Sequence, residues 1–72
     1  MNKIHNLKSV VIDHNLFSFF YIRIQCDKCG NSRFRVYIID PETVAVYETI
    51  FKCQEFQITE RVSDYINSEV VA

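Results

Sequence analysis

The chain has 72 residues, a formal net charge of −1 and a hydrophobic fraction of 49%, with one Gly, one Pro and three Cys. This length fits a single domain over residues 1–72, and the hydrophobic fraction is too high for a disordered segment. No apolar stretch is long enough to span a membrane, and residues 1–12 lack the apolar run of an export signal, which predicts a cytoplasmic protein.

Segments rich in β-branched and aromatic residues predict four β-strands, at residues 7–13, 16–25, 32–39 and 44–52. His14-Asn15 predicts the turn of the first hairpin, a register that sets Val10 opposite Phe19. In the second hairpin, Asp40-Pro41-Glu42-Thr43 is typical of a type I turn, with Pro at its second position.

From residue 58 onward the apolar residues follow helical spacing, at positions 58, 62, 65, 66 and 70. This spacing predicts a helix over residues 59–71, with Thr59 as its N-cap and Glu60 in its first turn. The predicted fold class is α+β, a small four-stranded antiparallel sheet of two hairpins with a C-terminal helix on one face. A core of this size is marginal, so we expect a metal, disulfides or a partner subunit to support it.

Two cysteines lie in the segment Cys26-Asp27-Lys28-Cys29-Gly30 between the second and third predicted strands. The Cys-x2-Cys-Gly pattern is typical of a metal knuckle, in which the turn directs two thiolates to one point and Gly takes a left-handed backbone. A redox pair is a weaker alternative, because it requires a thioredoxin-like setting with the pair opening a helix. Buried or free cysteines are the third reading.

The third cysteine, Cys53, follows the fourth predicted strand, and the two arms of the second hairpin have equal lengths. Cys53 therefore returns to the knuckle, where we expect it to be a metal ligand; the alternative is a buried core cysteine. The order strand, Cys-x2-Cys-Gly, strand, turn, strand, Cys resembles a zinc ribbon over roughly residues 16–56. The family has a second Cys-x2-Cys knuckle, whereas Phe56 stands here at the place of its fourth cysteine. The second knuckle is therefore degenerate.

The predicted register of the first hairpin places His5 near the knuckle end of the sheet and His14 at the far end. We therefore expect a structural Zn²⁺ bound by Cys26, Cys29, Cys53 and His5, a tetrahedral Cys3His set. Glu55 and Asp27 are the alternative fourth ligands, and an ordinary exposed histidine is the alternative for His5.

Charge is segregated along the chain, because residues 1–39 carry a net charge of +4 and residues 40–72 a net charge of −5. Alternation predicts one basic face with interleaved tyrosines, suited to phosphates and bases. The candidate nucleic-acid-binding residues are Arg23, Arg33, Arg35, Tyr21, Tyr37 and Lys28. The alternative for Arg35 is a cross-strand ion pair with Glu48.

The even-numbered residues of the two central strands are apolar, and we expect the helix to pack against the face that they form. It comprises Phe20, Ile22, Ile24, Phe34, Val36 and Ile38. Phe17 and Phe19 then lie on the other face, where an exposed apolar patch would bind a partner or a second copy of the chain.

The sequence contains no catalytic triad with positional support and no glycine-rich phosphate loop, so we expect no enzymatic activity and no small-molecule substrate. The first hypothesis is a zinc-ribbon-like regulatory or accessory protein, of phage or prokaryotic type, that binds nucleic acid or a nucleic-acid-processing protein. The resemblance favours it, since zinc ribbons commonly serve transcription and translation. The alternative is a protein-interaction module or inhibitor, a homodimer for example, in which zinc is purely structural.

Overall fold

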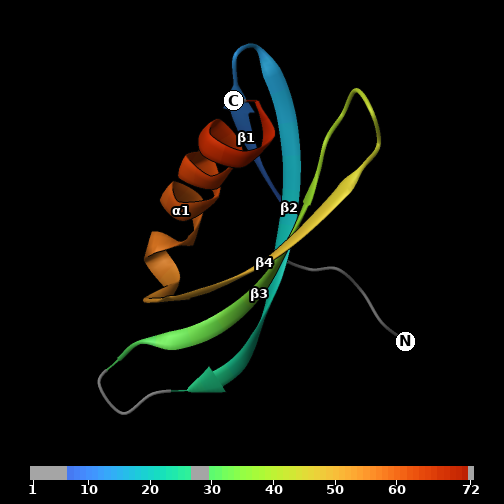
Figure 1. Cartoon of the computed structure of the whole chain (residues 1–72). Helices are drawn as coiled ribbons and strands as arrows, with labels where there is room; N and C mark the ends of the chain where they lie inside the picture. Colours follow the sequence, from blue (N-terminus) through green and yellow to red (C-terminus); the bar gives the residue numbers. More distant parts are fainter. Residues whose placement is uncertain (1–6, 27–29, 72) are drawn as a thin grey trace.

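The computed structural model describes residues 7–26 and 30–71, which form an antiparallel sheet followed by one C-terminal helix (Figure 1). Neighbours in sequence are neighbours in the sheet, in the order β1 (Lys8–Ile12), β2 (Asn15–Cys26), β3 (Ser32–Ile39) and β4 (Val46–Cys53). The 16-residue helix comprises a 3₁₀ turn (Glu55–Gln57), α1 (Ile58–Tyr65) and a π-helical last turn (Ile66–Val70). The predicted α+β class is confirmed, and each predicted strand is present.

The first hairpin turns one residue earlier than predicted, at Asp13-His14. Both residues have positive φ, 51° and 67°, as a two-residue hairpin turn of type I′ requires. Val10 consequently pairs with Phe17, and the predicted pairing with Phe19 is wrong. The sequence left this open because Asp tolerates positive φ as Asn does.

The second hairpin has the predicted turn at Asp40, but its loop extends to residue 45. The Asp40 carbonyl accepts the Val44 N–H at 2.9 Å, and its side chain accepts the Glu42 N–H at 2.9 Å. Val44 has a φ of 58°, which reverses the chain two residues later than expected. Ile39 therefore pairs with Val46, and β4 begins two residues later than the strand predicted at 44–52.

The helix covers one face of the sheet, and the core lies between the two layers (Figure 1). Ile58, Val62 and Ile66 are buried, as their helical spacing predicts. The helical segment begins earlier than predicted, because residues 55–57 already form a 3₁₀ turn after Gln54. The Gln54 N–H donates to the Gln57 side chain at 3.0 Å, so Thr59 is not the N-cap.

The face of β2 that meets the helix is the opposite of the predicted one. Cys26 pairs with Ser32, but a β-bulge at Ile24 shifts the register, and Phe19 then pairs with Ile38. One extra residue in β2 moves the side chain of every earlier residue of the strand to the opposite face of the sheet. Phe17 and Phe19 are therefore core residues, 1% and 0% exposed, and the predicted apolar surface patch at these positions is wrong.

Candidate functional site

The two described cysteines lie on one line across the sheet. Cys53 pairs with Ser32, which pairs with Cys26, so Cys53 returns to the end of β2 as predicted. Two strand spacings separate the cysteines, about 10 Å between Cα atoms. Gly30 has a φ of 89°, the left-handed backbone expected of it. Cys53 is buried, and this burial raises the pKa of its thiol.

The other proposed zinc ligands, Cys29 and His5, lie outside the described residues, as do Asp27 and Lys28. Within residues 7–26 and 30–71, no three His, Cys, Asp or Glu side chains gather in a group that could hold a metal ion. Cys26 is exposed at the end of β2, and Cys53 at the end of β4 is a buried core residue. Of the four predicted zinc ligands, the structure therefore describes only Cys26 and Cys53.

The predicted basic face divides between the two sides of the sheet. Directly paired residues share a face, and Arg23 pairs with Phe34, a core residue below the helix. Arg33 and Arg35 alternate with Phe34 along β3 and therefore lie on the side away from the helix. The prediction of one surface with all three arginines is wrong, because the bulge at Ile24 exchanges the faces of β2.

The two tyrosines predicted for that surface divide in the same way. Tyr21 pairs with Val36 on the side of the sheet that the helix covers, whereas Tyr37 pairs with Phe20 on the side away from the helix. The Phe20 and Tyr37 rings stack with their centroids 5.0 Å apart. The two tyrosines therefore cannot contribute to one stacking surface.

Arg35 forms the predicted ion pair with Glu48, with 3.2 Å between Nε and Oε2. The contact is diagonal, since Arg35 pairs directly with Ile50 and Tyr37 pairs with Glu48. The positive charge of Arg35 is thus balanced by Glu48 on the side of the sheet away from the helix.

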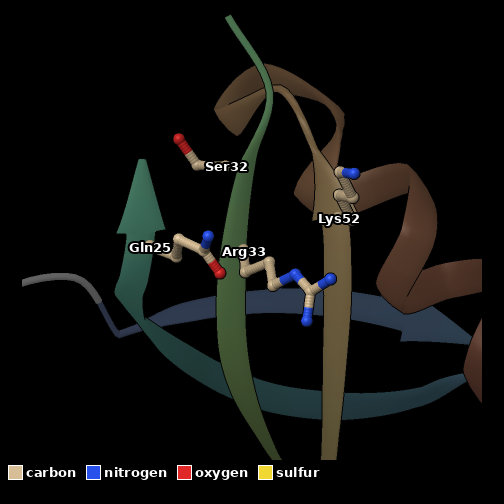
Figure 2. A pocket seen from close by; sticks show the side chains of 4 residues that line it. All are labelled: Gln25, Ser32, Arg33 and Lys52. Atoms are coloured by element: carbon tan, nitrogen blue, oxygen red, sulfur yellow. The ribbon is translucent and has the colours of Figure 1, made fainter. Parts of the chain in front are cut away.

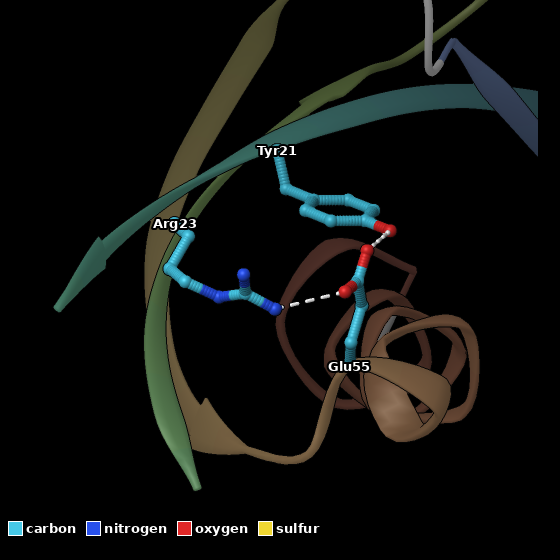
Figure 3. Close-up of polar contacts among 3 residues, drawn as sticks. All are labelled: Tyr21, Arg23 and Glu55. Carbon is cyan, nitrogen blue, oxygen red and sulfur yellow. Dashed lines mark hydrogen bonds and ion pairs between the residues drawn. The ribbon is translucent and has the colours of Figure 1, made fainter. Parts of the chain in front are cut away.

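Tyr21, Arg23 and Glu55 form a polar cluster that joins β2 to the first turn of the helix (Figure 3). The Tyr21 hydroxyl donates to Glu55 Oε2 at 2.8 Å, and Arg23 donates to Glu55 Oε1 at 2.9 Å. The Arg23 guanidinium also lies 5.3 Å from the centre of the Phe34 ring. Arg23 is thus engaged in holding the helix on the sheet, and Glu55, an alternative zinc ligand in the sequence, is its acceptor.

This cluster predicts a loss of stability at alkaline pH. Burial, together with the hydrogen bond to Glu55, raises the pKa of Tyr21 above its ordinary value of 10.0. In the unfolded chain Tyr21 ionises at the ordinary pKa. Its contribution to the free energy of unfolding is therefore fully present below about pH 10 and is lost as the pH rises through the higher pKa of the folded state. Chemical denaturation at several pH values should show a shallower alkaline decline in Tyr21→Phe and in Glu55→Gln. An unchanged decline in both variants would contradict this role.

The face of the sheet away from the helix carries large exposed aliphatic side chains together with Ser18 and the Arg35–Glu48 ion pair, and none of the described elements covers it (Figure 1). Five aliphatic side chains on it are 50% to 62% exposed, namely Val11, Leu16, Ile22, Val46 and Ile50. Half-buried Phe20, Tyr37 and Ile39 lie among them. We call this surface the open face. The open face therefore combines exposed aliphatic side chains with a stacked aromatic pair.

The end of the open face nearest Cys26 is polar. Gln25, Arg33 and Lys52 lie in one row across β2, β3 and β4. Together with Ser32 they line a small pocket that is open to solvent (Figure 2). The row gives this end of the face a positive charge.

No protein-family model matches this chain, and no curated protein or solved structure matches it either. None of the described helices is long and apolar enough to cross a membrane. The resemblance to zinc ribbons therefore stays a prediction from the residues that carry it.

Proposed function

We propose that this chain is a small protein-binding module without catalytic activity, and that the open face of its sheet is the binding surface. The observation that carries the proposal is the exposure of Val11, Leu16, Ile22, Val46 and Ile50 on one face. Each is a large aliphatic side chain whose burial by a partner is worth about 1 kcal/mol or more. The stacked rings of Phe20 and Tyr37 lie among them and suit the centre of a protein interface.

Nucleic-acid binding has less support on the same surface. Arg23 lies on the helix side, paired with Glu55, and Arg35 is paired with Glu48. Arg33 and Lys52 place basic side chains at one end of the open face, four residues along the strands from the aromatic pair, and they keep nucleic acid as the second candidate. A surface with so few basic side chains and so many aliphatic ones favours a protein over a polyanion.

The experiment compares Ile22→Glu with Phe56→Glu. Both changes place a carboxylate at an exposed apolar residue, but Phe56 lies in the helical segment, away from the open face. Chemical crosslinking of the tagged chain in a lysate, read by mass spectrometry, should give adducts that Ile22→Glu abolishes and Phe56→Glu retains. Equal adducts from both variants would contradict a binding role for the open face. Binding of single-stranded DNA that falls with salt and weakens in Arg33→Ala would favour the second candidate.

We further propose that a structural Zn²⁺ is bound at the Cys26 end of the sheet. Cys26 and Cys53 would hold it together with Cys29 and His5, tying the ends of β2 and β4 to one another. The thiols must be deprotonated to bind the ion, and the ion itself provides the stabilising charge.

Alkylation of the cysteines tests the zinc proposal. Without metal, exposed Cys26 should react rapidly with iodoacetamide, and buried Cys53 should react only on unfolding. In the zinc-bound protein both should be protected, and a chelator should restore the reaction of Cys26. Native mass spectrometry should show one zinc per chain, lost in Cys53→Ser. If Cys26 reacts at the same rate with and without chelator, and no zinc is found, the proposal is wrong.

A further inference from the structure

We infer that the occupant of the open face is a second copy of this chain, packed face to face in a two-fold symmetric dimer. The inference rests on the proposed function, because it names the partner of the same surface. Three features carry it: the size of the face, the distribution of charge along it, and the symmetry that this distribution permits.

The open face is large enough for a dimer. Four strands of about eight residues cover roughly 26 Å by 19 Å, a footprint on the order of 500 Å². The accessible area of a side-chain surface exceeds its footprint, so the face approaches the roughly 600 Å² or more per partner of a specific interface. The aromatic pair Phe20–Tyr37 lies near its middle, with apolar residues on either side.

The charges are polarised along the strands. One end of the sheet carries the exposed cation Arg33, directly across from Lys52 of β4. The opposite end carries Asp13 in the first hairpin turn and Asp40 and Glu42 in the second loop. The centre is balanced, because Glu48 pairs with Arg35. The face therefore has a positive end and a negative end, separated by a centre in which Arg35 and Glu48 balance one another.

A face polarised in this way complements a copy of itself in one orientation. A two-fold axis between the sheets, perpendicular to the strands and near Tyr37, sets the positive end of each copy against the negative end of the other. Arg33 is four residues from Tyr37, about 13 Å along the strand, so it meets the second copy near residue 41, beside Glu42. An axis parallel to the strands would instead oppose two positive ends. Each contact occurs twice, as in an isologous interface.

Sedimentation equilibrium over a range of concentrations tests the inference. The wild-type chain should sediment with twice the mass of one chain. Ile22→Glu should weaken dimerisation about a hundredfold or more, since it buries a second carboxylate beside Arg35, which already pairs with Glu48. Phe56→Glu should dimerise as the wild type does. Circular dichroism should show the same folded spectrum for both variants, because both residues are exposed in the monomer.

Charge reversal tests the orientation. Arg33→Glu should weaken the dimer, and Arg33→Glu combined with Glu42→Arg should restore it. A dimer that the single change leaves intact, or that the double change does not restore, would overturn the proposed orientation. A wild-type monomer at all concentrations would overturn the dimer itself. The proposed function would survive that result if crosslinking to another protein were still abolished by Ile22→Glu, and it would fail with the dimer if no such adduct formed.

Discussion

Phe19→Ala is expected to lower the free energy of unfolding by about 3–5 kcal/mol. Phe19 is fully buried between the sheet and the helix, and it pairs with Ile38 at the centre of the core. Its removal leaves a cavity that the surrounding strands cannot fill without breaking their register. Since a domain of this size has a total stability of about 4–11 kcal/mol, the variant should be largely unfolded at moderate temperature.

The matched control is Phe56→Ala, which makes the same chemical change at a residue that is 79% exposed. Urea denaturation followed by circular dichroism should place its unfolding free energy within about 0.5 kcal/mol of the wild type. Equal effects of the two substitutions would contradict the placement of Phe19 in the core. They would instead support an exposed position for Phe19, as alternation without a bulge would give.

Val62→Asp is expected to prevent folding of the chain. Val62 is fully buried in the middle of α1, and no described side chain in the core offers a positive partner for a carboxylate. Leaving an unpaired charge in such a core costs several kcal/mol, comparable to the whole stability of the domain. Circular dichroism and proton NMR should show loss of both strand and helix signals, because the sheet alone has two uncovered apolar faces.

The control for this variant is Thr59→Asp, three residues earlier in the same helix and exposed to solvent. An acidic residue in the first turn interacts favourably with the helix dipole, so we expect a change of a few tenths of a kcal/mol, in the stabilising direction. A folded Val62→Asp chain with an intact sheet would show that the helix is not required for the core.

Local patterns were sufficient to predict the elements of this fold. The β-branched and aromatic runs located all four strands, and the spacing of Ile58, Val62 and Ile66 located the helix and its buried face. These signals depend on neighbouring residues alone, so the sequence contains them in full. The order of the strands followed from short hairpin connections.

The assignment of faces required information that local patterns lack. A single bulge at Ile24 decides that Phe19 is buried and Ile22 exposed, and an unbulged β2 would reverse both. The run from Phe17 to Ile24 is apolar on both parities, so alternation alone does not distinguish the two registers. Because of this ambiguity, the sequence placed the exposed apolar patch at Phe17 and Phe19, which are core residues, and not at the residues of the open face.

The candidate site was predicted in part. The ion pair of Arg35 and Glu48 was predicted and is confirmed, although through a diagonal contact. The role of Glu55 as acceptor for Tyr21 and Arg23 was missed, because it depends on the helix beginning directly after β4. An acidic residue in the first turn, facing the end of a strand that carries Arg, is the signal that would have indicated it.

The central claim is that a second copy of this chain covers the open face, and methyl NMR with a soluble paramagnetic agent tests it most directly. In concentrated wild-type protein, the methyl signals of Ile22 and Ile50 should be protected nearly as well as those of buried Ile66, while those of exposed Leu7 should be strongly attenuated. Dilution should expose Ile22 and Ile50. Attenuation of Ile22 and Ile50 as strong as that of Leu7 at every concentration would contradict the claim for a second copy of the chain.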